Sequence, residues 1–183
     1  MADPFTLVHD AIWDCLEAYS GFTDLVGESN RIDLTGASRA PNKQAKNTAD
    51  YPQVRVVPAG ADTPELRDTS DDGKVMRSYE IQISTGTMLA GGTVYPGNIY
   101  NIEWNIYKAL LNWKNYWGPM SSLTITGEDD EEYNFVTSMD FGASEQGVDS
   151  GALAEQNIGG WNTLLTLKFF MTFPRAAFAP SIE

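Results

Sequence analysis

The sequence has very little cysteine and histidine, the side chains that most metal and nucleophilic sites need. Its 183 residues include one cysteine, Cys15, and one histidine, His9. A single cysteine excludes an internal disulfide and any cysteine-based zinc site. A single histidine removes most arrangements of metal hydrolases. We therefore expect neither a bound metal nor a cofactor.

Basic side chains and long apolar runs are also scarce. Twelve Lys and Arg stand against 25 Asp and Glu, so the net charge is −13. Proteins that bind a nucleic-acid backbone or an anionic membrane need a basic face, so this charge disfavours both partners. No apolar run approaches the roughly 18 residues of a membrane helix. The opening Met1–Pro4 lacks the basic start of a secretory signal, and we expect a soluble protein made inside the cell.

What is present is enough apolar side chain for a core. Apolar residues make up 42% of the chain, whose length suits one domain. Helical spacing of apolar residues occurs twice, over about residues 4–19 and 99–113. The first run begins after Asp3, a good N-cap, and the second ends before Pro119.

Short alternating or apolar stretches predict strands between and after these helices. The predicted strands are residues 31–34, 51–57, 75–84, 123–126, 133–141 and 161–173. The predicted loops are the polar stretches 35–50, 58–72 and 142–160. This order indicates one α+β domain over residues 1–183, with a mostly antiparallel sheet, two main helices packed on one face and long loops.

Neither His9 nor Cys15 is expected to do chemistry. His9 follows the helical pattern beside Asp10, and sequence neighbours point to different sides of a helix. We therefore expect no preformed pair, and an exposed or half-packed histidine. Cys15 is expected to be a small buried residue. Phosphate-binding glycine motifs are absent, no catalytic residue is assigned, and we expect a protein that is not an enzyme.

The most conspicuous charge feature is an acidic run. It consists of Glu128, Asp129, Asp130, Glu131 and Glu132. From Asn115 to Leu167 there are nine acids and no Lys or Arg. The run can be explained as a calcium site, a solvated turn, or a surface that repels a negative partner. It lacks the spaced order of a dedicated calcium loop, and we assign no metal to it.

The long loop at 35–50 is locally basic. It carries Arg39, Lys43 and Lys46, which can pair with an acidic neighbour. Loops of this length are uncommon in compact domains and are usually functional or disordered. We expect this loop to contact a neighbouring subunit.

Aromatic side chains crowd the second helix and its end. They are Trp104, Tyr107, Trp113, Tyr116 and Trp117. Packing beneath loops is one explanation. The other is a subunit interface, where Trp and Tyr are enriched, with Trp104, Tyr107 and Trp117 as the candidates.

Four segments together resemble a family of phage proteins. They are HDAIWDCLEAYSGFTDLV at 9–26, YPQVRVVPAG at 51–60, SYEIQIS at 78–84 leading into the helix at 99–113, and GWNTLLTLKFF at 160–170. In the order of its elements and the pattern of its apolar residues, the chain is similar to the tail-terminator, or tail-completion, proteins of long-tailed bacteriophages. That family includes head-tail joining proteins. The resemblance covers most of the chain and rests on no catalytic motif. The chain departs from the family in its greater length and its extended loop at 35–50.

The resemblance implies a structural virion protein. Such proteins typically form a hexameric ring at the head-proximal end of the tail tube, which ends tube polymerisation and joins the tail to the head or neck. The implied partners are further copies of the chain, the tail tube protein and a neck or connector protein, with assembly in the host cytoplasm. DNA passes through the lumen without specific binding, and no membrane is involved. The acids Glu128–Glu132, if they line that channel, repel its phosphates.

Three other functions are compatible with the sequence. One is another ring of the neck, such as a stopper or adaptor-like connector. The second is a small-molecule binding module with the aromatic cluster as its pocket. The third is an enzyme that uses two carboxylates. The assembly state separates the ring proteins from the other two classes.

Overall fold

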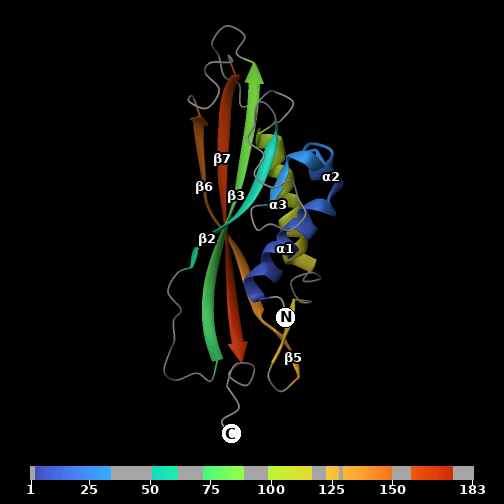
Figure 1. Cartoon of the computed structure of the whole chain (residues 1–183), viewed down its shortest axis with the longest axis vertical. Helices are drawn as coiled ribbons and strands as arrows, with labels where there is room; N and C mark the ends of the chain where they lie inside the picture. The colour runs from blue at the N-terminus through green and yellow to red at the C-terminus, as the bar shows by residue number, and fades with distance from the viewer. Residues whose placement is uncertain are drawn as a thin grey trace.

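The fold is α+β, as the sequence predicts, with two main helices on one face of a mostly antiparallel sheet (Figure 1). A computed structural model describes residues 3–33, 51–61, 72–88, 99–116, 123–127, 130–149 and 158–174. The helices are α1 (Pro4–Glu17), α2 (Ser20–Thr23) and α3 (Ile99–Tyr116), with a 3-10 turn at Glu28–Asn30. The strands are β1 (Arg31–Asp33), β2 (Gln53–Ala61), β3 (Asp72–Met88), β4 (Thr124–Thr126), β5 (Glu132–Asn134), β6 (Val136–Asp149) and β7 (Ile158–Pro174).

The main sheet has the strand order β1-β2-β3-β7-β6. The β1–β2 pair is parallel and the other pairs are antiparallel. β3 and β7 pair along their whole length, from Asp72 opposite Pro174 to Met88 opposite Ile158. The last strand of the chain therefore lies inside the sheet, and β1 and β6 are its edges. β4 and β5 form a separate hairpin.

The core lies between the helices and one face of the sheet. The helical spacing buries Val8, Ile12 and Leu16 of α1. The two-residue period of the strands buries alternate side chains of β3 and β7 on the same side. The strand contributions include Tyr79, Ile81, Ile83, Leu165, Leu167 and Phe169. Each such side chain contributes about 1.5–3 kcal/mol when it is fully buried.

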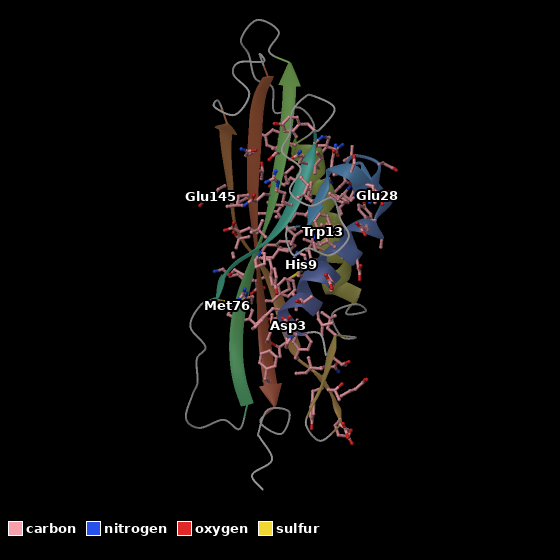
Figure 2. The ribbon with its side chains drawn as sticks, viewed as in Figure 1. Asp3, His9, Trp13, Glu28, Met76 and Glu145 are labelled. Atoms are coloured by element: carbon pink, nitrogen blue, oxygen red, sulfur yellow. The ribbon has the colours of Figure 1, made fainter. Side chains whose placement is uncertain are left out.

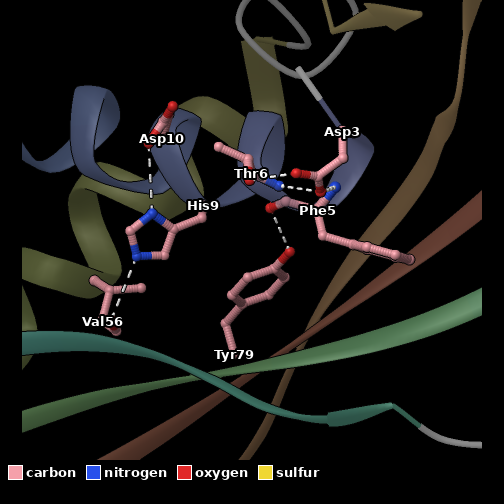
Figure 3. A network of polar contacts seen from close by, with 7 residues as sticks. All are labelled: Asp3, Phe5, Thr6, His9, Asp10, Val56 and Tyr79. Atoms are coloured by element: carbon pink, nitrogen blue, oxygen red, sulfur yellow. Dashed lines mark hydrogen bonds and ion pairs between the residues drawn. The ribbon is translucent and has the colours of Figure 1, made fainter. Parts of the chain in front are cut away.

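Asp3 caps the start of α1 (Figure 3). Its Oδ1 accepts hydrogen bonds from the backbone N–H groups of Phe5 and Thr6, each at 3.0 Å, and its Oδ2 accepts one from the Thr6 hydroxyl at 2.7 Å. The hydrogen bonds from Thr6 lower the pKa of this carboxyl in the folded protein. The stabilisation is therefore present above the unfolded pKa of the group and is lost as pH falls through the folded one.

Replacing Asp3 by alanine is expected to lower the free energy of unfolding by about 1 kcal/mol at neutral pH, because two backbone donors lose their partner. Asp3→Asn, which keeps an acceptor, should lose much less. Urea titrations at pH 7 and at pH 3 measure both variants. The difference in free energy of unfolding between wild type and Asp3→Ala should be smaller at pH 3 than at pH 7. A larger difference at pH 3 would contradict the cap assignment.

The position of His9 differs from the expectation. The side chain is 1% exposed, not exposed or half-packed. Its Nε2 lies 3.4 Å from the carbonyl oxygen of Val56 in β2, and its Nδ1 lies 3.5 Å from Oδ1 of Asp10 (Figure 3). The expectation that His9 and Asp10 form no pair was therefore also wrong. α1 lies close to β2, so His9 is buried together with the apolar side chains of α1. The contact of His9 with Val56 links the helix to the sheet.

Several strand boundaries also differ from the prediction. β3 runs from Asp72 to Met88, beyond the predicted residues 75–84 at both ends. β2 continues through Ala61, into the stretch predicted as a loop. β6 continues to Asp149 and β7 begins at Ile158. Most of the residues predicted as a loop at 142–160 therefore belong to strands. The strand predicted at 133–141 divides into β5 and the start of β6. For β2 and β6, pairing with the next strand along the chain extends an end whose own side chains are polar or small.

Candidate subunit interface

The strand β6 forms one edge of the main sheet. It pairs with β7 on one side, and no other described strand pairs with it on the other. Figure 1 shows it on the outside of the sheet. A sheet edge presents a row of backbone N–H and C=O groups that can pair with another chain. β6 spans 14 residues, which is long for an edge strand.

Two irregularities interrupt β6. The register shifts between Val136 and Ser138, and again between Phe141 and Ser144. At the first, the Thr137 hydroxyl donates a hydrogen bond of 2.9 Å to the Phe170 carbonyl. Bulges of this kind twist an edge strand and limit uncontrolled pairing. The irregular edge can therefore pair with a strand of matching twist, and it disfavours pairing with a flat, regular strand.

The second irregularity depends on Gly142. A β-carbon at this position would lie 3.0 Å from Cβ of Thr166 on β7. Cβ of a β-branched residue is fixed to the backbone, so the two strands would have to separate. We expect Gly142→Ala to lower the free energy of unfolding by about 1–3 kcal/mol.

Chemical denaturation measures the effect of Gly142→Ala. Gly27→Ala is the matched control, because nothing lies within 4 Å of a β-carbon there. Its backbone has φ −60°, which alanine adopts freely. Equal stability of the two variants would show that Gly142 is not needed for close approach of the strands.

A stripe of large apolar side chains is exposed along α3. Tyr100, Trp104 and Leu111 are 51%, 55% and 37% exposed. At 3.6 residues per turn, steps of four and seven place all three on one side of the helix. Nζ of Lys108 lies 5.4 Å from the centre of the Trp104 ring. α3 also buries a second apolar face in the core, made by Ile99, Ile102, Ile106 and Leu110.

α3 contacts β6 through residues other than those of the exposed stripe. The Tyr107 ring packs against Phe141 of β6, with centroids 4.9 Å apart. The Ser144 hydroxyl donates a hydrogen bond of 3.2 Å to Oε1 of Glu103. Burial, and then the charge of Glu103, raise the pKa of Tyr107. We call β6 together with Tyr100, Trp104 and Leu111 the edge surface.

The charges on the edge surface are mainly acidic. Asp140 and Glu145 of β6 are exposed, with Lys168 of β7 opposite Asp140, and Glu103 of α3 is partly exposed beside Ser144. Lys108 of α3 contributes one positive charge to this surface. Large exposed apolar side chains with a polar surround are typical of protein contact sites.

The acidic run of the sequence lies elsewhere, in the β4–β5 hairpin. Asp130, Glu131 and Glu132 are exposed there, and Asp130 adopts a left-handed backbone with φ 62°. Glu128 and Asp129 lie outside the described residues. The described acids of the base-free window are thus divided between this hairpin and β6. No group of three or more His, Cys, Asp or Glu in the described parts of the chain is placed to hold a metal ion.

The predicted interface aromatics have different positions. Trp104 is exposed, whereas Tyr107 is half-buried against Phe141. Trp117 lies outside the described residues, as do Arg39, Lys43 and Lys46. Sequence reasoning missed Tyr100 and Leu111, although their helical spacing from Trp104 is visible in the sequence.

Cys15, which the sequence predicts to be buried, is partly buried in α1. Its thiol donates a hydrogen bond of 3.1 Å to the carbonyl oxygen of Ala109 in α3. Burial, and then the nearby Asp14, raise the pKa of this thiol to about 12. The thiolate is the reactive form, so the folded protein should hold very little of it near neutral pH.

We therefore expect Cys15 to react with iodoacetamide at pH 8 at least 100-fold more slowly in the folded protein than in urea. Mass spectrometry of timed samples measures the rate. Cys15→Ala should lower the free energy of unfolding by about 1 kcal/mol and leave assembly unchanged. Rapid labelling of the folded protein would contradict the assignment.

Comparisons with known proteins show little. No protein family and no curated protein matches the chain. Among solved structures, one similar chain comes from "Virion of native gene transfer agent (GTA) particle". It is 12% identical, with a TM-score of 0.48, and the match covers 88% of this chain and 93% of that chain. That neighbour belongs to a virion particle. The described part of the present chain has no helix that could cross a membrane.

Proposed function

We propose that the protein is a structural component of a phage-like virion and forms a closed ring at the head-proximal end of the tail tube. The ring ends tube polymerisation and joins the tail to the head or neck. The observation that supports assembly is the edge surface, where β6 is a sheet edge and contacts, through Tyr107 and Glu103, the helix that carries exposed Tyr100 and Trp104. The place in the virion and the number of six subunits come from the resemblance of the sequence to tail-terminator proteins.

A ring accounts for the edge surface better than a monomer does. Exposed aromatic side chains beside an open strand edge favour association with another chain. Association that repeats in one direction gives a ring when the rotation closes, and a fibre when it does not. The two bulges of β6 favour a partner of defined shape, as closure requires.

In this role the protein is not an enzyme. Its partners are copies of itself, the tail tube protein and a neck or connector protein, while DNA passes through the lumen. The exposed acids Asp130, Glu131 and Glu132 of the β4–β5 hairpin, facing that lumen, repel the phosphates of the duplex. Glu128 and Asp129 extend the same charge in sequence.

Imaging of intact particles by cryo-electron microscopy tests the proposal. The map should show a ring of this protein between the tail tube and the neck, with the β4–β5 hairpin toward the channel. Particles assembled without the protein should have tubes of uncontrolled length. Tubes of normal length attached to leaking heads would identify another neck ring, such as a stopper. A protein present only as a monomer in the particle would contradict the proposal.

A further inference from the structure

We infer that two contacts between α3 and β6 fix the second irregularity of β6, and that they determine whether copies of the chain close into a ring. The contacts are Tyr107 with Phe141 and Glu103 with Ser144. We call them the bulge contacts. The inference rests on the proposed ring and specifies which residues set its geometry. Glu103 and Tyr107 are positioning residues, because they act through the edge strand.

The second irregularity of β6 is a β-bulge. Phe141 lies opposite Leu167 of β7, and Ser144 lies opposite Leu165. Two residues of β6 between these pairs therefore face one residue of β7. An extra residue of this kind bends the strand and increases its local twist. A neighbouring chain that pairs with this edge has to follow the same twist.

The bulge contacts lie on either side of the bulge. The Tyr107 ring packs on Phe141, the last paired residue before the bulge, with centroids 4.9 Å apart. Ser144, the first paired residue after it, donates its hydrogen bond of 3.2 Å to Oε1 of Glu103. The irregular part of β6 is therefore attached to the helix at both of its ends.

The spacing of the two contacts is the same on the helix and on the sheet. Glu103 and Tyr107 are four residues apart on α3, which is a rise of about 6 Å. Leu165 and Leu167, which lie opposite the contacted residues of β6, are two residues apart, or about 7 Å. Three residues of a regular strand would cover about 10 Å. The extra residue shortens this path, so both contacts can form at once.

The bulge also determines which side chains of β6 face α3. Side chains alternate between the two faces of a strand, so residues three apart in a regular strand point to opposite faces. Phe141 and Ser144 nevertheless both contact α3. Figure 2 shows the next residue, Glu145, at the edge of the sheet away from the helices. Without the bulge, Glu145 would face the acid Glu103 in place of Ser144.

The bulge contacts are next to the exposed stripe on the surface of α3. Tyr107 is three residues after Trp104 and four before Leu111, and Glu103 is three residues after Tyr100. Residues three and four apart are neighbours on a helix surface. A copy that docks on the stripe therefore also meets the part of β6 whose twist the bulge contacts fix.

A fixed twist at this interface gives a fixed rotation from one copy to the next. Repeated association closes into a ring only when that rotation is suitable, and otherwise continues as a filament. Loss of the bulge contacts removes both attachments of the bulge to α3, so β6 can adopt a flatter shape. Flat strand edges favour open-ended pairing. The bulge contacts thus favour closure over open-ended growth.

A double substitution on α3 tests the inference. Glu103→Ala with Tyr107→Ala removes both bulge contacts and places a good helix former at each position. Wild type should form rings of one size. The variant should form filaments, because the rotation between copies is no longer fixed. Electron microscopy and sedimentation velocity measure the sizes, and thioflavin T fluorescence should rise about 10-fold over wild type.

Two controls separate this role from a general loss of stability. Glu17→Ala with Tyr19→Ala removes the same two kinds of side chain from partly buried positions on the α1–α2 side of the molecule (Figure 1). Glu103→Gln keeps an oxygen that accepts the hydrogen bond from Ser144. Both should form rings like wild type. Circular dichroism and thermal unfolding show whether each variant is folded.

A milder variant applies if the double substitution unfolds the protein. Ser144 is exposed, so Ser144→Ala removes one bulge contact with little effect on the fold. Filaments should then appear beside rings. In that case, rings alone would overturn the inference.

The outcomes distinguish the inference from the proposed ring. If wild type forms rings, and the folded double variant forms the same rings or stays monomeric, the bulge contacts do not set the geometry and the ring stands. A wild type that stays monomeric at all concentrations contradicts the ring. Filaments of the double variant alone would then support the role of the bulge contacts, and a monomeric double variant would overturn it.

Discussion

Replacing Tyr100 and Trp104 together by aspartate is expected to abolish assembly and leave the fold intact. Both side chains are more than half exposed on α3, so the folded monomer loses little apolar contact with them. In an interface, central aromatic residues commonly contribute 2 kcal/mol or more each. Two losses of about 2 kcal/mol each correspond to an assembly roughly 700-fold weaker, before the added acids repel Glu103.

The measurement is sedimentation across a range of protein concentrations, with thermal unfolding as the check on folding. Phe170→Asp is the matched control. Phe170 is an aromatic residue that is 36% exposed on β7, away from the α3 stripe. This variant should assemble over the same range of protein concentration as wild type. Assembly of the Tyr100/Trp104 variant over that range would show that the α3 stripe is not part of the interface.

The largest loss of stability is expected for Trp13→Ala. Trp13 is fully buried in α1, within the cluster of apolar side chains that joins helix and sheet (Figure 2). Removing so large a side chain from a packed core costs about 3–5 kcal/mol, which includes the cavity left behind. Domains of this size are stable by only about 5–15 kcal/mol, so the variant should be marginally folded at 25 °C.

Trp104→Ala is the control for Trp13→Ala, because it makes the same chemical change on the exposed side of α3. We expect Trp104→Ala to change the free energy of unfolding by less than about 1 kcal/mol, mainly through its contact with Lys108. Equal losses for the two variants, measured by urea denaturation, would contradict the assignment of Trp13 to the core.

The sequence predicts those parts of the fold that local patterns determine. The spacing of Val8, Ile12 and Leu16 identifies α1, and the alternation of Tyr79, Ile81 and Ile83 identifies β3 and its buried side. The fold class follows from the order of these elements. Strand lengths do not follow, because pairing with β7 extends the polar end of β6 and no pattern within β6 itself records that pairing.

The candidate interface is predictable in part. Trp104 is an interface candidate from the sequence alone, because exposed tryptophan in a helix favours a contact. The edge position of β6 depends on the strand order, which arises from long-range pairing. The burial of His9 was missed for a related reason, since it depends on how α1 is rotated against β2. Local periodicity predicts which side of a helix or strand is buried. It does not predict which other elements pack against that side.

The unequal lengths of the two layers affect how the protein can meet several partners. β3 and β7 each have 17 residues, a length of about 58 Å, whereas the 18 residues of α3 extend only about 27 Å. Roughly half of the β3–β7 ladder therefore projects past the helical layer (Figure 1). In the proposed ring, a subunit of this shape would act as a spacer. Its two ends lie tens of ångströms apart on one continuous ribbon, so two docking partners would not compete for room.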